Sequence, residues 1–150
     1  MALSVAFHIL AAIIWIGGMF FAHMIVRPSV AVFEPAQRLA LFAQVFKRFF
    51  AWVWAAVIAL LVTGYWMIFT TYDGFAGLPI YLHLMHGIGW LMILLFMHLW
   101  FAPYRRFKQA MIAADHAEAG RRLGQIRMVV SVNLALGLIN SIIGAAGLYL

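Results

Sequence analysis

The chain has 150 residues, of which 67% are hydrophobic, with ten basic and four acidic side chains. A soluble domain of this length keeps a large share of its residues at the surface, so it could not hide this much apolar surface from water. The composition therefore excludes a soluble globular domain. It predicts a single integral membrane domain over residues 1–150, whose apolar surface faces lipid.

Cysteine is absent, which excludes both a disulfide framework and a thiolate metal site. The net charge of +6 would suit a nucleic-acid partner if the basic residues formed a patch. They flank apolar runs instead, which is the pattern of a membrane protein, and we expect no nucleic-acid binding. The first apolar run has no basic residue before it, so we expect a span rather than a cleaved signal peptide.

In chain order, the hydropathy pattern predicts four membrane spans of about 20 residues, the length that crosses a bilayer core. They cover residues 2–26, 51–71, 80–102 and 128–150. The first is expected to stop at Arg27-Pro28 and the third at Pro103, because proline disfavours helix continuation. Residues 36–50 form a short amphipathic helix before the second span. The expected fold is thus an all-α membrane four-helix bundle.

The basic residues predict the orientation. All ten lie in the first and third connections, between residues 27 and 48 and between 105 and 127. Since cytoplasmic loops carry an excess of Lys and Arg, both termini and the second loop with Asp73 are expected outside. In a bacterial inner membrane this places the termini on the periplasmic side.

The fourth span carries small and polar residues at spacings of four: Asn133, Gly137, Ser141 and Ala145. A face of small side chains lets helices approach closely. We interpret it as a packing face, either within the bundle or with another copy in a homo-oligomer.

Five of the six histidines lie within apolar spans, all on the first and third: His8, His23, His83, His86 and His98. An ionisable side chain inside a membrane is costly and indicates function. The two spans are parallel. His8 and His23 are 15 residues apart, as are His83 and His98, so each pair covers about 22 Å of helix. Histidines therefore occur at two matched depths.

Haem iron accepts two axial imidazoles, and four-helix bundles build cofactor sites from facing side chains. We expect His8 with His83 or His86 to hold an outer haem, and the sequence does not choose between these two. His23 with His98 would hold an inner one. This arrangement predicts two b-type haems, or one if only one level is used.

Copper is the main alternative, because imidazole and thioether ligands suit Cu(I). Met19 and Met24 flank His23, while Met85, Met92 and Met97 accompany the histidines of the third span. Methionine is also common filler in apolar cores, and these positions form no continuous ladder. A structural role for the histidines, as polar contacts between helices, is the third interpretation.

The segment from His8 through Trp15 to Gly17-Gly18, followed by Val26-Arg27-Pro28, resembles the first helix of the CopD/HemJ group of small membrane proteins. The third span, with Leu82-His83, His98 and Tyr104-Arg105-Arg106, is also similar to HemJ-type sequences. The resemblance implies a four-helix haem b protein. It carries over by position to His8, Trp15, Gly18 and His83.

HemJ-type members are linked to protoporphyrinogen oxidation and CopD-type domains are named for copper resistance. HemJ-type proteins have a lysine shortly after the third-span histidine, where this chain has Met85. The resemblance therefore does not extend to protoporphyrinogen oxidase activity.

The sequence thus predicts a membrane b-type cytochrome, with a haem-dependent oxidoreductase activity left open. Quinone or a redox protein is the expected electron partner, because the sites open into lipid. The alternatives are a copper-handling CopD-type protein and a small haem-bearing subunit of a larger respiratory complex. No nucleophile constellation is present, which excludes a hydrolase.

Overall fold

The computed structural model describes residues 1–149, and this part of the chain is helical throughout with short connections. Four helices are long and apolar enough to cross a membrane, as the sequence predicts: Ala2–Val32, Pro35–Thr71, Ile80–Ile112 and His116–Ala146. Their outward faces carry large apolar side chains such as Leu3, Ile58 and Leu94. The predicted membrane four-helix bundle is confirmed. The predicted end of the fourth span, Leu150, lies outside the described residues.

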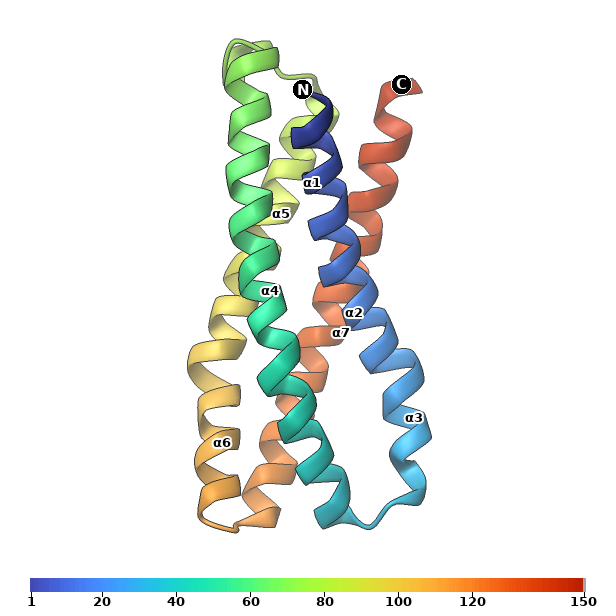
Figure 1. The fold of residues 1–150 in the computed structure, drawn as a ribbon, viewed down its shortest axis with the longest axis vertical. Helices are drawn as coiled ribbons and strands as arrows, with labels where there is room; N and C mark the ends of the chain where they lie inside the picture. Colours follow the sequence, from blue (N-terminus) through green and yellow to red (C-terminus); the bar gives the residue numbers. More distant parts are fainter. Residues whose placement is uncertain (150) are drawn as a thin grey trace.

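The helices alternate in direction, so both termini lie at one end of the bundle (Figure 1). We call this the termini end, and it also holds the loop with η4 (Phe75–Gly77). All ten basic residues lie in the half near the opposite end, which we call the basic end. The first long helix packs chiefly along the second, and the third packs along the fourth.

The first long helix is irregular. It comprises α1 (Ala2–Ala12), η1 (Ile13–Gly17), α2 (Gly18–Phe20), η2 (Phe21–Val26), α3 (Arg27–Ser29) and η3 (Val30–Val32). It continues beyond the predicted stop at Arg27-Pro28. The wider turns of η2 precede the proline, and insertions of this kind accommodate an interrupted hydrogen-bond ladder. The Ser29 hydroxyl also donates to the Ile25 carbonyl, one turn earlier, at 2.7 Å.

The second long helix, α4 (Pro35–Thr71), is a single helix of 37 residues. Glu34 and Gln37 form a capping box at its start, and Pro35 occupies the first turn. The predicted amphipathic helix is therefore present and runs without a break into the second span. Residues 36–63 contain neither glycine nor proline, so nothing interrupts the helix between them.

The third long helix joins α5 (Ile80–Leu99), η5 (Trp100–Tyr104) and α6 (Arg105–Ile112). It too passes its proline, Pro103, through a wider turn. The fourth, α7 (His116–Ala146), starts where the Asp115 carboxylate accepts from the Glu118 backbone N–H at 2.9 Å. It ends before η6 (Gly147–Tyr149).

Aromatic side chains fill the half of the bundle near the basic end. Rings of α4 interleave with rings of the third long helix: Phe50 lies 4.9 Å from Tyr104, and Trp54 lies 5.2 Å from Phe96, between centroids. We call this set the aromatic core; its members are Phe42, Phe46, Phe50, Trp54, Phe96, Trp100, Tyr104 and Phe107. Edge-to-face pairs of this kind add to the stability gained by burial.

The small face predicted on α7 is partly used inside the bundle. Asn133 is buried and donates from Nδ2 to the Met92 carbonyl of α5 at 3.2 Å. A side chain at Gly137 would press on Ile16 and Met92, so this glycine permits a three-helix approach. Ser141 and Ala145 are exposed. Association of two copies through this helix stays a prediction.

Candidate functional site

The histidines occupy the two ends of parallel helices. The first and third long helices both run from the termini end to the basic end (Figure 1). His8 of α1 and the pair His83 and His86 of α5 therefore lie in the half near the termini end, while His23 and His98 lie toward the basic end.

His8 points into the bundle. It shares a face of its helix with the buried residues Ala11, Trp15 and Met19, at spacings of three and four. Its Nδ1 lies 2.8 Å from the Thr63 hydroxyl on α4. A Cβ added to Gly64 would touch the His8 ring at 3.4 Å, so a small residue on α4 gives the ring its place.

The Thr63 contact fixes the tautomer of His8. The Thr63 hydroxyl donates its hydrogen to the Ala59 carbonyl, 2.6 Å away in the preceding turn. Its oxygen is then an acceptor toward His8, so the proton of the neutral ring sits on Nδ1. The Nε2 lone pair is left available. A hydrogen bond of this kind on one ring nitrogen is the usual support of a metal-ligating histidine.

His86 is the more enclosed of the two histidines at the start of α5. Its ring is half-buried, edge-on to Tyr65 at 5.5 Å and to Phe75 at 5.3 Å. Trp90, one turn further along, donates from Nε1 to the Tyr65 hydroxyl at 3.3 Å. His83 is exposed. The turn of α4 at residues 63–65 thus contacts both His8 and His86, from two different helices.

His23 and His98 have different surroundings. His23 faces α7, with its Nε2 3.2 Å from the Ser131 hydroxyl, and it lines a pocket at the basic end. His98 is exposed on α5. About two turns before His23, the first and third helices meet through aromatic rings: Trp15 lies edge-on to Phe96 at 6.1 Å.

Trp15 and Gly18 have packing roles. Trp15 is only 3% exposed and belongs to the bundle interior. A Cβ at Gly18 would overlap the ring of Phe49, so the glycine allows the first helix to approach α4. By contrast, Gly17, Gly87 and Gly89 have open space where a side chain would be.

The methionines also pack against other helices. The thioether of Met85 lies against Gly144, and the methyl group of Met92 lies against Gly137, both on α7. Flexible side chains of this type fill gaps beside glycines. Among residues 1–149, no group of three His, Cys, Asp or Glu side chains could hold a metal ion. A metal would need fewer protein ligands of these types, as haem iron does.

The sequence did not lead us to expect that α4 contributes residues to the candidate site. Thr63, Gly64 and Tyr65 supply the partners of His8 and His86, although the second span has no histidine. The available signal was a run of polar and small residues, Thr63-Gly64, in an otherwise apolar span. In lipid, hydroxyl side chains of this kind form hydrogen bonds between helices.

Comparison with known proteins gives one family. The family model described as "CopD: Copper resistance protein D" matches residues 43–147. The match covers most of α4 and all of α5, α6 and α7, including His83, His86 and His98. No curated protein and no solved structure matches the chain. The matched region takes up more than half of the chain, which is therefore an integral membrane protein that belongs to the CopD family.

Proposed function

We propose that the protein is a membrane b-type cytochrome that holds one haem at its termini end and passes single electrons through it. His8, through its Nε2, and His86 are the residues that would hold the haem iron. The observation that carries the proposal is the hydrogen-bond chain from His8 Nδ1 through Thr63 to the Ala59 carbonyl. It orients an intramembrane imidazole with its free nitrogen unprotonated.

The residues around the site fit this role. Thr63 holds the His8 ring in one orientation, and Gly64 leaves space for it. Tyr65 and Phe75 flank His86 and limit the rotation of its ring. Haem iron ligated by two imidazoles supplies reversible one-electron transfer. The exposed neighbour His83 lacks comparable support, so His86 is the better of the two candidates.

A second haem at the basic end does not fit. His98 is exposed, His23 is directed to Ser131, and the aromatic core lies at that depth of the bundle. We therefore expect one haem per chain rather than two. Quinone remains a suitable electron partner, because His83 and Gly87 are exposed at the same end and there is open space beside Gly87 and Gly89.

Copper binding is the second candidate, and the family description favours it. The Nε2 lone pair of His8 would serve a copper ion as well as haem iron, since imidazole suits both. Copper would need a different remaining ligand set, drawn from His86 and solvent or substrate ligands. Both candidate functions use His8, but they predict different absorption spectra.

The test is a reduced-minus-oxidised absorption spectrum combined with metal analysis of protein purified after growth with ample haem and copper. We expect a haem b spectrum with about one haem per chain, given one supported bis-imidazole level. His8→Ala should lose it, while His116→Ala, an exposed histidine at the start of α7, should keep it. Copper without haem would favour the second candidate. If the wild-type protein contains neither haem nor copper, both candidate functions are refuted.

The orientation belongs to the same proposal. Both termini should lie on the outer side, since all ten basic residues lie toward the opposite end. The chain has no cysteine, so a single introduced cysteine is the only thiol that a reagent can label. A thiol reagent that does not cross the bilayer should label Ala76→Cys, near η4, but not Ala113→Cys, after α6. The reverse labelling would overturn the orientation.

A further inference from the structure

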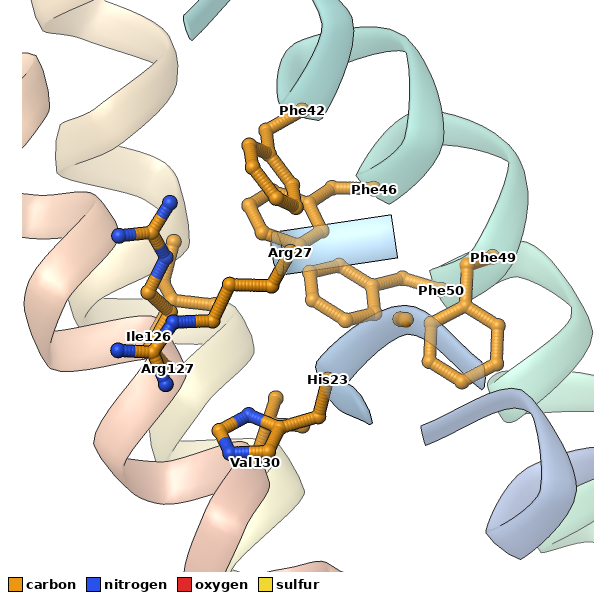
Figure 2. Close-up of a pocket in the computed structure, with 10 residues that line it drawn as sticks. His23, Arg27, Phe42, Phe46, Phe49, Phe50, Ile126, Arg127 and Val130 are labelled. Carbon is orange, nitrogen blue, oxygen red and sulfur yellow. The ribbon is translucent and has the colours of Figure 1, made fainter. Parts of the chain in front are cut away.

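A pocket lies at the basic end, where the first long helix diverges from α4 and α7 (Figure 1). His23 and Arg27 line it from the first helix and Arg127 lines it from α7 (Figure 2). Phenylalanines of α4, among them Phe42 and Phe49, form the wall that faces them. We call it the arginine pocket. Its cavity of about 20 Å³ has room for only a few atoms.

The positive charge of the arginine pocket has no counterion among the residues that the structure describes. Of the four acidic residues, Asp73 lies at the termini end. Glu34 belongs to the capping box of α4, and Asp115 caps α7. Glu118 pairs with Arg121 and Arg122. No carboxylate of residues 1–149 therefore remains to pair with Arg27 or Arg127.

Arg127 has unused hydrogen-bonding capacity in the pocket. Its Nε is buried and has no hydrogen-bond partner among the described residues. Its guanidinium carbon lies 5.1 Å from the centre of the Phe42 ring, a cation–π contact that holds the side chain in place. Arg27 and Arg38 are close enough to act electrostatically on it. Like charges held together with a free donor favour the binding of an anion from outside the chain.

An apolar groove begins beside the arginine pocket. It is lined by Ile14, Gly18, Phe49 and Trp52, and has a volume of about 270 Å³. Phe49 belongs to both sites, so the groove leads from the arginine pocket along the seam between the first helix and α4. Trp52 is exposed to the surroundings of the bundle. Since that surface faces lipid, the groove suits a hydrocarbon chain.

We propose that the arginine pocket and this groove together bind one anionic phospholipid, with the phosphate group between Arg27 and Arg127 and an acyl chain along Gly18 and Phe49. Arginine forks match phosphate oxygens in geometry and charge. Basic pockets between membrane helices bind anionic head groups in this way. The site does not depend on the haem or copper of the termini end.

The combination of pocket and groove selects a lipid over a free anion. A free phosphate ion would fill the small cavity and leave the apolar groove without an occupant. A phospholipid places its charged group and its chain in the two adjacent sites at once. The binding energy of both parts then adds within one molecule, which soluble phosphate cannot achieve.

The test is to exchange lipids between the purified protein and vesicles of equal parts phosphatidylglycerol and phosphatidylcholine. Lipid retained per chain is then counted by native mass spectrometry. The wild-type protein should retain about one phosphatidylglycerol in preference to phosphatidylcholine. In the double variant R27Q/R127Q the apparent affinity should fall roughly 25-fold, since each basic residue near an anionic head group contributes about fivefold.

The matched control is R105Q/R106Q, which removes two exposed arginines at the same end outside the pocket. Both variants lower the formal net charge by two from +6, so an unspecific charge effect would be equal in both. Equal retention in the two double variants, or no preference for phosphatidylglycerol in the wild type, would overturn the proposal. If R27Q/R127Q fails to fold, R27Q alone replaces it, because Arg27 is exposed.

Two competitors separate the lipid from a free anion. Inorganic phosphate and glycerol phosphate carry the charged group without the chain, so millimolar amounts of either should leave the retained lipid in place. Displacement of the lipid by either one would show that the pocket takes a soluble phosphate and that the groove adds nothing. Because the count needs neither haem nor copper, its failure is independent of the function proposed for His8.

Discussion

The two halves of the bundle are held together by different contacts. Near the termini end, polar groups join the helices: His8 meets Thr63, and Trp90 donates to Tyr65. Near the basic end, the aromatic core fills the interior, and Phe50 and Phe107 are almost completely buried. Polar contacts can be exchanged for a ligand, whereas packed rings cannot move without loss of burial. The difference is consistent with a ligand site in the first half, as proposed, and with a rigid second half.

Two histidines illustrate this difference between the two halves. His8 lies on the face of its helix that α4 covers, whereas His98 lies on a face of α5 that no described helix covers. Two histidines that both lie inside apolar spans are thus not equivalent candidates for a ligand.

Phe50→Ala should destabilise the half of the bundle that holds the aromatic core, and we expect the largest effect on the free energy of unfolding from this change. Phe50 is 1% exposed and contacts rings on both α4 and the third long helix. The cavity left behind should lower the free energy of unfolding by about 3 kcal/mol or more. Thermal unfolding in detergent measures it. Phe101→Ala is the control, because Phe101 is 60% exposed and should change little; equal losses would refute the aromatic core as the stable half.

Gly18→Ala tests the seam between the first long helix and α4. The added Cβ overlaps the Phe49 ring, so the two helices must separate or Phe49 must leave its place. We expect a loss of about 2 kcal/mol, as for other overpacked sites. The neighbouring Gly17→Ala is matched in chemistry but meets nothing within 4 Å. It should be neutral or slightly stabilising, since alanine favours helix. A similar loss at both positions would point to backbone flexibility instead.

Thr63→Val tests the hydrogen bond between His8 and Thr63 at the termini end. Valine keeps the shape of threonine but removes the acceptor that holds the proton of His8 on Nδ1. Affinity for the bound metal group should fall about tenfold, the lower range for loss of a partner of a ligating histidine. Unfolding free energy should change by less than about 1 kcal/mol, as is usual for hydrogen bonds between membrane helices.

Haem or copper titration of the purified protein measures this affinity. Thr70→Val is the control, since the Thr70 hydroxyl bonds only within its own helix, to the Trp66 carbonyl. If Thr63→Val binds as the wild type does, the His8–Thr63 contact is structural and the proposed function loses its support.

The fold was largely predictable because its determinants are local. Four apolar runs of sufficient length, and the position of every basic residue, define the spans and their alternation. The helix ends were less predictable. Pro28 and Pro103 indicate a stop by local rules, but wider turns at η2 and η5 let both helices continue. Those turns depend on packing, which a linear pattern does not contain.

The site was predictable only in part. Histidines inside apolar spans identified His8 and His86 as candidates, and their depth followed from the helical rise. Their partners did not follow, because Thr63 and Tyr65 lie on a helix without histidines. Which helix faces which is a tertiary property: the first packs on α4 rather than symmetrically against the third. The prediction of two equivalent histidine pairs, one at each depth, assumed that symmetry, and the proposed site keeps only the pair of His8 and His86.

Asn133→Leu should have the smallest effect and the opposite sign. Asn133 is buried between α7 and α5, and its Oδ1 has no hydrogen-bond partner among the described residues. The Met92 carbonyl that it contacts belongs to α5 and keeps its place in that helix. Leucine removes the unsatisfied oxygen, so the unfolding free energy should rise by about 0.5 kcal/mol or stay unchanged.

Ser141→Ala is the control for this change, because Ser141 is exposed and bonds within α7, to the Gly137 carbonyl. A loss of more than about 2 kcal/mol in Asn133→Leu would contradict the expectation, since it exceeds what hydrogen bonds between membrane helices contribute. It would mean that Asn133 fixes the register between α5 and α7, and with it the position of His86. In that case the polar contacts that orient the termini end would extend through the middle of the bundle rather than stop at Tyr65.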